Sequence, residues 1–207
     1  MLLAVVPEVA SAESLCTDSL NVAEGKWSTL ADWSAGHVPE ASNVACVGIE
    51  KTFTVDGTDV AGVVQGQGTV AIPTGSLEVG NALETSVIHS ISLTGGTLTG
   101  AATVEVSGAL TWEGGGMTGS GETFVQSGAT AAMSNVYIEG SRVVLNEGTA
   151  TLGSNTFSMA GAVAARSDSR SLPRWAVSPR RAKRRALAVG REVEGILVRP
   201  GAQRDYG

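Results

Sequence analysis

The sequence Leu-Thr-Gly-Gly-Thr-Leu-Thr-Gly at residues 93–100 decides the fold, because a related sequence follows it at an offset of 19. The second copy is Trp-Glu-Gly-Gly-Gly-Met-Thr-Gly at 112–119, and Thr-Gly-Ser-Leu at 74–77 precedes the first copy at a similar spacing. Downstream, Ser-Gly-Ala at 107–109 and 127–129 match at an offset of 20, and Gly-Thr-Ala at 148–150 continues that spacing. A repeat of this length is typical of a solenoid, in which each repeat is one structural unit.

Apolar and polar residues alternate between the glycines, which predicts short β-strands. The clearest case is Thr-Val-Glu-Val-Ser at 103–107, and residues 52–56, 76–79, 90–94 and 109–113 follow the same pattern. Alternation with a period of two places the apolar residues on one side of a strand and Thr, Ser or Glu on the other. No helical periodicity competes before about residue 180.

Glycine clusters separate these strands and are predicted to turn the chain with φ > 0. Antiparallel hairpins would need Asn-Gly or Asp-Gly turns, and residues 56–57 are the one such pair. The all-β fold is therefore predicted to be a parallel β-helix of about six coils over residues 42–162, with Leu98 stacked on Met117; a β-sandwich is the alternative. The predicted turn glycines are Gly95, Gly96, Gly100, Gly114, Gly115 and Gly119.

The ends of the chain differ from its middle. The 207 residues carry a formal net charge of −6, but residues 1–165 hold 3 basic and 16 acidic side chains (−13), and residues 166–207 hold 11 and 4 (+7). Residues 163–207 are interpreted as a basic, disordered tail, with a short helix near 180–195 as an alternative. A third interpretation, translation in a shifted reading frame, is favoured because the break falls inside a repeat.

The N-terminus resembles the end of a signal peptide. Within residues 1–12, the first six form a short apolar segment, and the last three, Ala-Ser-Ala, are the small-residue pattern of a cleavage site, although a basic n-region is missing. A disordered apolar N-terminus is the alternative. Cys16 and Cys46 are the two cysteines, and in an exported protein such a pair predicts a disulfide bond. Two buried free thiols are the alternative, and no membrane span is expected.

Residues 13–41 are predicted to cap the open end of the solenoid. Their motif W-x5-W-x2-G-x2-P runs from Trp27 through Trp33 to Pro39. Large rings can cover a solenoid core and protect its first strands, whereas a sugar-stacking platform is the other use of such rings.

These motifs resemble those of secreted, adhesin-like β-solenoid proteins of bacteria, common in actinobacteria. The resemblance covers about residues 20–162 and includes the two glycine-rich repeats and, imperfectly, residues 142–150. It implies a right-handed parallel β-helix, export, and a stalk or adhesive role at the cell surface. It implies no known ligand and no catalytic residue. The residues themselves suggest no metal site or cofactor, because the cysteine, histidine and aspartate motifs of such sites are missing.

Candidate chemistry is sparse. Outward Glu78, Glu105, Glu113 and Glu122 are interpreted as a solvated surface rather than as the paired carboxylates of a glycosidase. Threonine pairs at 52/54, 97/99 and 149/151 could order water and bind ice if they were stacked on a flat face. They do not recur at a fixed position in every repeat, so ordinary outward threonines are favoured.

The sequence therefore predicts a non-enzymatic, secreted or cell-surface structural or adhesive module, with a carbohydrate-binding or carbohydrate-active β-helix as the alternative. A cell-envelope polysaccharide or a host or matrix glycan is the kind of partner expected. No nucleic acid is expected for the folded part.

Overall fold

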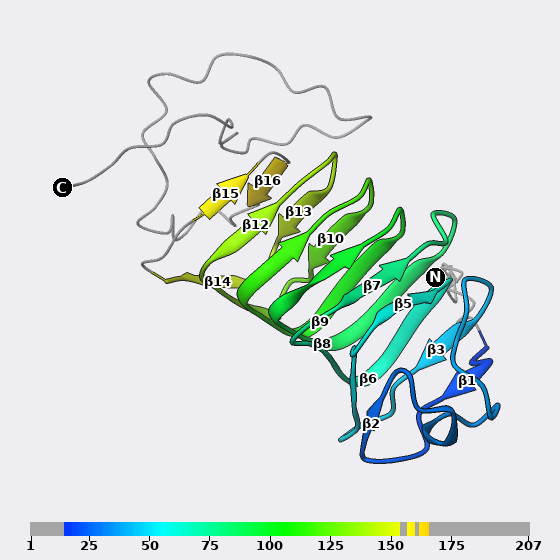
Figure 1. Ribbon diagram of the computed structural model, residues 1–207. Helices are drawn as coiled ribbons and strands as arrows, with labels where there is room; N and C mark the ends of the chain where they lie inside the picture. Colours follow the sequence, from blue (N-terminus) through cyan, green and yellow to red (C-terminus); the bar gives the residue numbers. More distant parts are fainter. Residues whose placement is uncertain (1–14, 154–156, 160–161, 166–207) are drawn as a thin grey trace, which may run out of the picture.

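The protein is a parallel β-solenoid of about six coils, seen in a computed structural model that describes residues 15–153, 157–159 and 162–165 (Figure 1). The strands of successive coils lie one behind another in rows, and every pairing between the described strands is parallel. Within the described residues, the exception to the β structure is a 3-10 turn, η1 (Leu30–Asp32). Parallel pairing between consecutive coils confirms the solenoid over the β-sandwich.

The pairings arrange the strands in three rows, called here the first, second and third faces. The first face consists of β1 (Asp18–Ser19), β3 (Val44–Cys46), the start of β6 (Val63–Ile72), β8 (Thr85–Thr99) and β9 (Thr103–Met117), then β10 (Glu122–Val125), β13 (Val143–Asn146) and β16 (Ala162–Ala165). The second consists of β2 (Glu24–Lys26), β4 (Thr52–Thr54), the end of β6, the middle of β8 and β9, β11 (Thr130–Met133) and β14 (Thr149–Leu152). The third consists of β5 (Thr58–Ala61), β7 (Ser76–Val79), the ends of β8 and β9, β12 (Val136–Ile138) and β15 (Phe157–Met159).

The register of the two glycine-rich repeats is the predicted one on either side of a local irregularity, at which Thr94 pairs with Gly114 at an offset of 20. Leu98 pairs with Met117 and Leu93 with Trp112, both at an offset of 19. Inward-facing residues of consecutive coils therefore stack on one another, and these four side chains are at most 1% exposed. A continuous apolar core follows, because no coil can bury its inner side without a neighbour.

The constant offset of 20 expected downstream is wrong. Ala109 pairs with Thr130 rather than with Ala129, and Thr130 in turn pairs with Thr149 rather than with Ala150. The cause is a corner of variable length: residues 126–129 connect β10 to β11, whereas residues 107–108 span the equivalent corner within β9.

Only half of the predicted turn glycines adopt positive φ. Gly100, Gly115 and Gly119 do, whereas the other three lie inside β8 and β9. At Gly96 a Cβ atom would lie 2.6 Å from the carbonyl oxygen of Thr74 in the preceding coil. The corresponding distances at Gly95 (to Pro73) and Gly114 (to Thr94) are 2.6 Å and 2.7 Å. These glycines are therefore needed for the close approach of consecutive coils rather than for a left-handed backbone.

The described strands begin within the predicted cap and extend past the predicted end of the solenoid. β1 and β2 pair with β3 and β4, so the segment 13–41 contributes strands of a first, short coil. β16 continues the first face to Ala165, past the predicted boundary at residue 162. The interpretations of residues 1–12 and 166–207 lie outside the described residues. Within the described part, no helix is long and apolar enough to cross a membrane.

Candidate functional site

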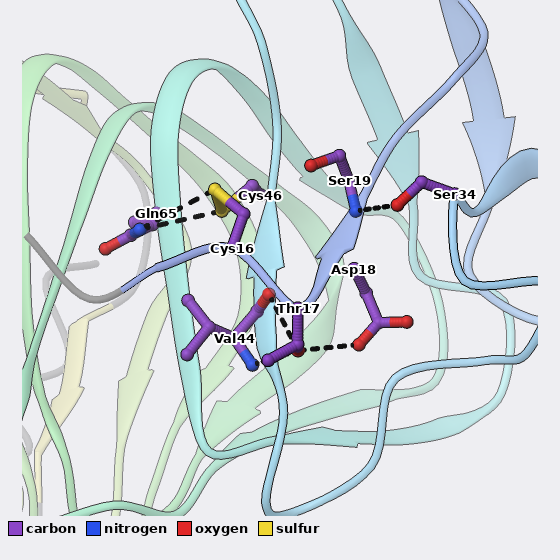
Figure 2. The surroundings of a disulfide bond; sticks show 8 residues. All are labelled: Cys16, Thr17, Asp18, Ser19, Ser34, Val44, Cys46 and Gln65. Carbon is purple, nitrogen blue, oxygen red and sulfur yellow. Dashed lines mark hydrogen bonds between the residues drawn. A yellow bond between two sulfur atoms is a disulfide. The ribbon is translucent and has the colours of Figure 1, made fainter.

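The first strand of the solenoid is held by a disulfide bond. Cys16 and Cys46 are bonded across a sequence separation of 30 residues, which joins the segment leading into β1 to β3 (Figure 2). The side-chain amide of Gln65, from the next coil, donates to the sulfur atoms of Cys46 at 3.6 Å and Cys16 at 3.8 Å. Thr17 adds a second link, because its Oγ1 accepts a 2.9 Å hydrogen bond from the backbone N–H of Val44.

The two tryptophans of the N-terminal motif form an aromatic cluster inside the first coil. Trp27 is 0% and Trp33 2% exposed, and both contact the buried ring of Phe53, with centroid distances of 5.0 Å and 5.8 Å. Trp33 Nε1 donates a 2.9 Å hydrogen bond to the carbonyl oxygen of Trp27. Neither indole has an exposed face on which a sugar ring could stack, so their position is that of a core cap.

A buried carboxylate and an exposed imidazole lie together at this end. The Asp18 side chain is fully buried, and its Oδ2 accepts a 2.7 Å hydrogen bond from Thr17 Oγ1. Its Oδ1 has no hydrogen-bond partner and lies 3.5 Å from Nδ1 of His37. No group of three or more metal-ligating side chains occurs among the described residues.

The second face carries a regular array of hydroxyl and methyl groups. In each of six consecutive coils, two outward positions separated by one residue hold only Thr, Ser or Ala, and the strand register aligns these pairs from β4 to β14. We call these twelve residues the hydroxyl face. They are Thr52 and Thr54, Thr69 and Ala71, Ser90 and Ser92, Ala109 and Thr111, Thr130 and Ala132, and Thr149 and Thr151.

Paired threonines do not recur in every coil of the hydroxyl face, as expected from the sequence, but the wider set of Thr, Ser and Ala does. Two of the three pairs found in the sequence, at 52/54 and 149/151, belong to it, whereas Thr97 and Thr99 lie on the third face. The intervening coils complete the array with single threonines, serines and alanines. A fixed sequence offset misses the array because the coils differ in length: the step from Thr52 to its partner Thr69 is shorter than the step from Thr69 to Ser90.

The first face carries a different cluster, made of carboxylates around an aromatic ring. Phe124 of β10 pairs with Glu105 of β9, and Gln126 Nε2 donates a 2.6 Å hydrogen bond to Glu105 Oε2. Partial burial, with a smaller contribution from the charge of Glu105, raises the pKa of Glu122. The half-buried ring of Phe124 therefore lies on the same face as two interacting acids from neighbouring strands.

Arg142 is the only arginine of the repeat region, and the sequence does not indicate where it points. The structure buries it completely, beside the inward-facing Thr123. Its Nε and Nη2 donate to Thr123 Oγ1 at 3.1 Å and 2.9 Å, and Nη1 donates to the carbonyl oxygen of Thr118 at 3.2 Å. Burial lowers its pKa to about 10, which still leaves the guanidinium charged at neutral pH.

Comparisons of the chain with models of protein families, with curated proteins and with solved structures found no match. The β-solenoid is established by the strand pairings, whereas membership of the adhesin-like group stays an interpretation of the sequence motifs.

Proposed function

We propose that the protein is a non-enzymatic, secreted or cell-surface β-solenoid module that adheres to an extended surface through the hydroxyl face. The observation that carries the proposal is the alignment of this face through six coils, since a repeating array suits a repeating partner better than a small ligand. Among the described residues, none of these threonine and serine hydroxyls forms a hydrogen bond with a histidine or a carboxylate that would activate it as a nucleophile, so the array favours binding over catalysis.

The N-terminal end supports export. A disulfide bond persists in oxidising compartments and is rare in the cytosol, and here it anchors the strand at which the described stack begins. Secretion also fits the short apolar segment and the small-residue cleavage pattern within residues 1–12.

Adsorption of the full chain to solid surfaces tests the proposal. The fluorescently labelled protein would be mixed with isolated bacterial cell walls, chitin, cellulose and polycrystalline ice, and the fraction bound to each solid measured after the solid is separated. Thr111→Lys places a long charged side chain in the middle of the hydroxyl face. Thr99→Lys is the matched control, because Thr99 is also a half-buried, outward threonine of the central coils but lies on the third face.

We expect adsorption that Thr111→Lys abolishes and Thr99→Lys preserves. Equal adsorption of both variants, or no adsorption of the natural protein to any solid surface, would contradict the adhesive proposal.

A carbohydrate-binding role is the second candidate, and the cluster around Phe124 favours it. An aromatic ring beside hydrogen-bonding carboxylates and an amide is a common way to hold a sugar. A glycan array probed with the natural protein and with Phe124→Ala tests this role. Tyr137→Ala, which removes an exposed ring from the third face, is the control. Binding that persists in Phe124→Ala, or no binding at all, would exclude this cluster as the site.

A further inference from the structure

The hydroxyl face differs from the rest of the outward surface in the types of side chain that are absent from it. Its twelve positions hold seven threonines, two serines and three alanines, with no charged, aromatic or long side chain. On the second face, Glu24 and Lys26 occupy the equivalent positions of the first strand, β2, so the restriction applies to the six coils from β4 to β14. The other two faces admit such residues within those coils, including Glu105 and Phe124 on the first and Glu78 and Tyr137 on the third. At these twelve positions, therefore, no side chain is longer than that of threonine.

The hydroxyl groups of this face are available to solvent. Of the nine, only that of Thr130 forms a hydrogen bond within the described part of the chain, a long one of 3.5 Å to the carbonyl oxygen of Gly108. The other eight are outward and not fully buried, so their donors and acceptors are satisfied by whatever lies against the face.

The array is held rigidly from below. The residues that alternate with it along the strands point inward and are at most 2% exposed in five of the six coils, as at Phe53, Val70, Ile91, Leu110 and Ala131. Because the inward side of each strand is held in a close-packed core, the outward groups on the same strand keep a fixed spacing.

The spacing defines a two-dimensional lattice. Neighbouring strands of a sheet lie about 4.8 Å apart, and alternate residues along a strand lie about 6.6–6.8 Å apart. Oxygen atoms on an ice surface likewise repeat in two directions at intervals of several ångströms. A threonine also presents a methyl group beside its hydroxyl, so the face can order water around apolar groups and hydrogen-bond to it at the same positions.

Crystalline polysaccharides are the competing class of extended partner. Their sugar rings are usually held by aromatic side chains and directed polar groups such as amides and carboxylates. The hydroxyl face has neither, and they occur instead around Phe124 on the first face. Water in a lattice is the partner whose chemistry the second face matches.

We propose that the hydroxyl face binds ice, and that it does so by ordering water into a layer that matches the ice surface. This inference rests on the proposed adhesive function of the same face and specifies its substrate as frozen water. Adsorbed protein then restrains growth of the ice between bound molecules, so the expected activities are thermal hysteresis and slower recrystallisation.

The test compares the full-length natural protein with Thr111→Lys and Thr99→Lys. Thermal hysteresis is measured on a single ice crystal, and adsorption is measured from incorporation of the labelled protein into a growing ice hemisphere. We expect the natural protein and Thr99→Lys to show both activities and Thr111→Lys to lose most of them. Circular dichroism and melting temperatures establish that both variants are folded, and Thr130→Lys provides a second, more exposed site on the face.

The outcomes separate this inference from the function on which it rests. No hysteresis and no incorporation of the natural protein would overturn ice binding, as would equal activity in Thr111→Lys and Thr99→Lys. If adsorption to a polymer depended on Thr111 while ice adsorption was absent, the adhesive function would stand and the ice inference would fail. If neither ice nor any polymer adsorbed the natural protein, both would fail.

Discussion

Loss of the disulfide bond should destabilise the solenoid from its N-terminal end. The bond closes a loop across a sequence separation of 30 residues. In the chain-entropy treatment, closing a loop of that size stabilises the folded state by roughly 3–4 kcal/mol. For a domain of this size, a change of about 1 kcal/mol shifts the melting temperature by about 2–4 °C, so the double variant Cys16→Ala/Cys46→Ala should melt roughly 6–16 °C lower.

Calorimetry and intrinsic fluorescence measure this effect together. Because β1 has only two residues and pairs with β3 alone, its detachment should expose Trp27 and Trp33 before Trp112 of the central coils. Reduction of the natural protein with a thiol reagent should reproduce the shift of the double variant, whereas the variant itself should no longer respond to the reagent. A melting temperature lowered by less than about 2 °C in both experiments would refute the reasoning that this loop limits stability.

Three further substitutions test the interior and the acidic cluster. Gly115→Ala would drive a Cβ atom into the carbonyl oxygen of Gly96 at φ +72°, whereas Gly128→Ala, at φ +89°, meets nothing within 4 Å. Urea unfolding should therefore show a loss of about 1–2 kcal/mol for Gly128→Ala and a clearly larger one for Gly115→Ala; equal losses would contradict the close-approach explanation. Replacing Arg142 and its partner together, as Arg142→Met/Thr123→Val, should be neutral or stabilising by about 1–4 kcal/mol, because a charge is no longer desolvated; a large loss would show that the guanidinium stabilises its coil. Because the pKa of Glu122 is raised in the folded protein, protonation of this carboxyl group stabilises the fold at low pH, and this stabilisation is lost as the pH rises through the folded pKa. As the pH rises from 4.5, the ordinary pKa of a glutamate, to neutral, the free energy of unfolding of Glu122→Gln should therefore increase relative to that of the natural protein. Parallel pH profiles of the two free energies would contradict the raised pKa.

The repeat and its register could be predicted where the coils have equal length. Residues 93–100 and 112–119 align without a gap, so the pairing of Leu98 with Met117 follows directly from the sequence. Beyond that region, corners gain or lose residues while the strands stay aligned, and a fixed offset fails. The buried position of Arg142 was also not predictable, because its inward direction depends on the register of a coil that departs from the repeat.

Strand propensity does not explain the composition of the hydroxyl face. Threonine suits strands, but valine, isoleucine, tyrosine and phenylalanine suit them at least as well, and alanine is depleted in them. None of those four apolar types occurs on this face, whereas Ala71, Ala109 and Ala132 do. The core does not impose the restriction either, because it constrains only the inward residues, and the same coils carry Glu105 and Tyr137 outward on their other faces. A restriction to small hydroxyl and methyl side chains that runs through six coils of one face, beginning after Glu24 and Lys26 in its first strand, is therefore what the proposed contact with an extended surface requires.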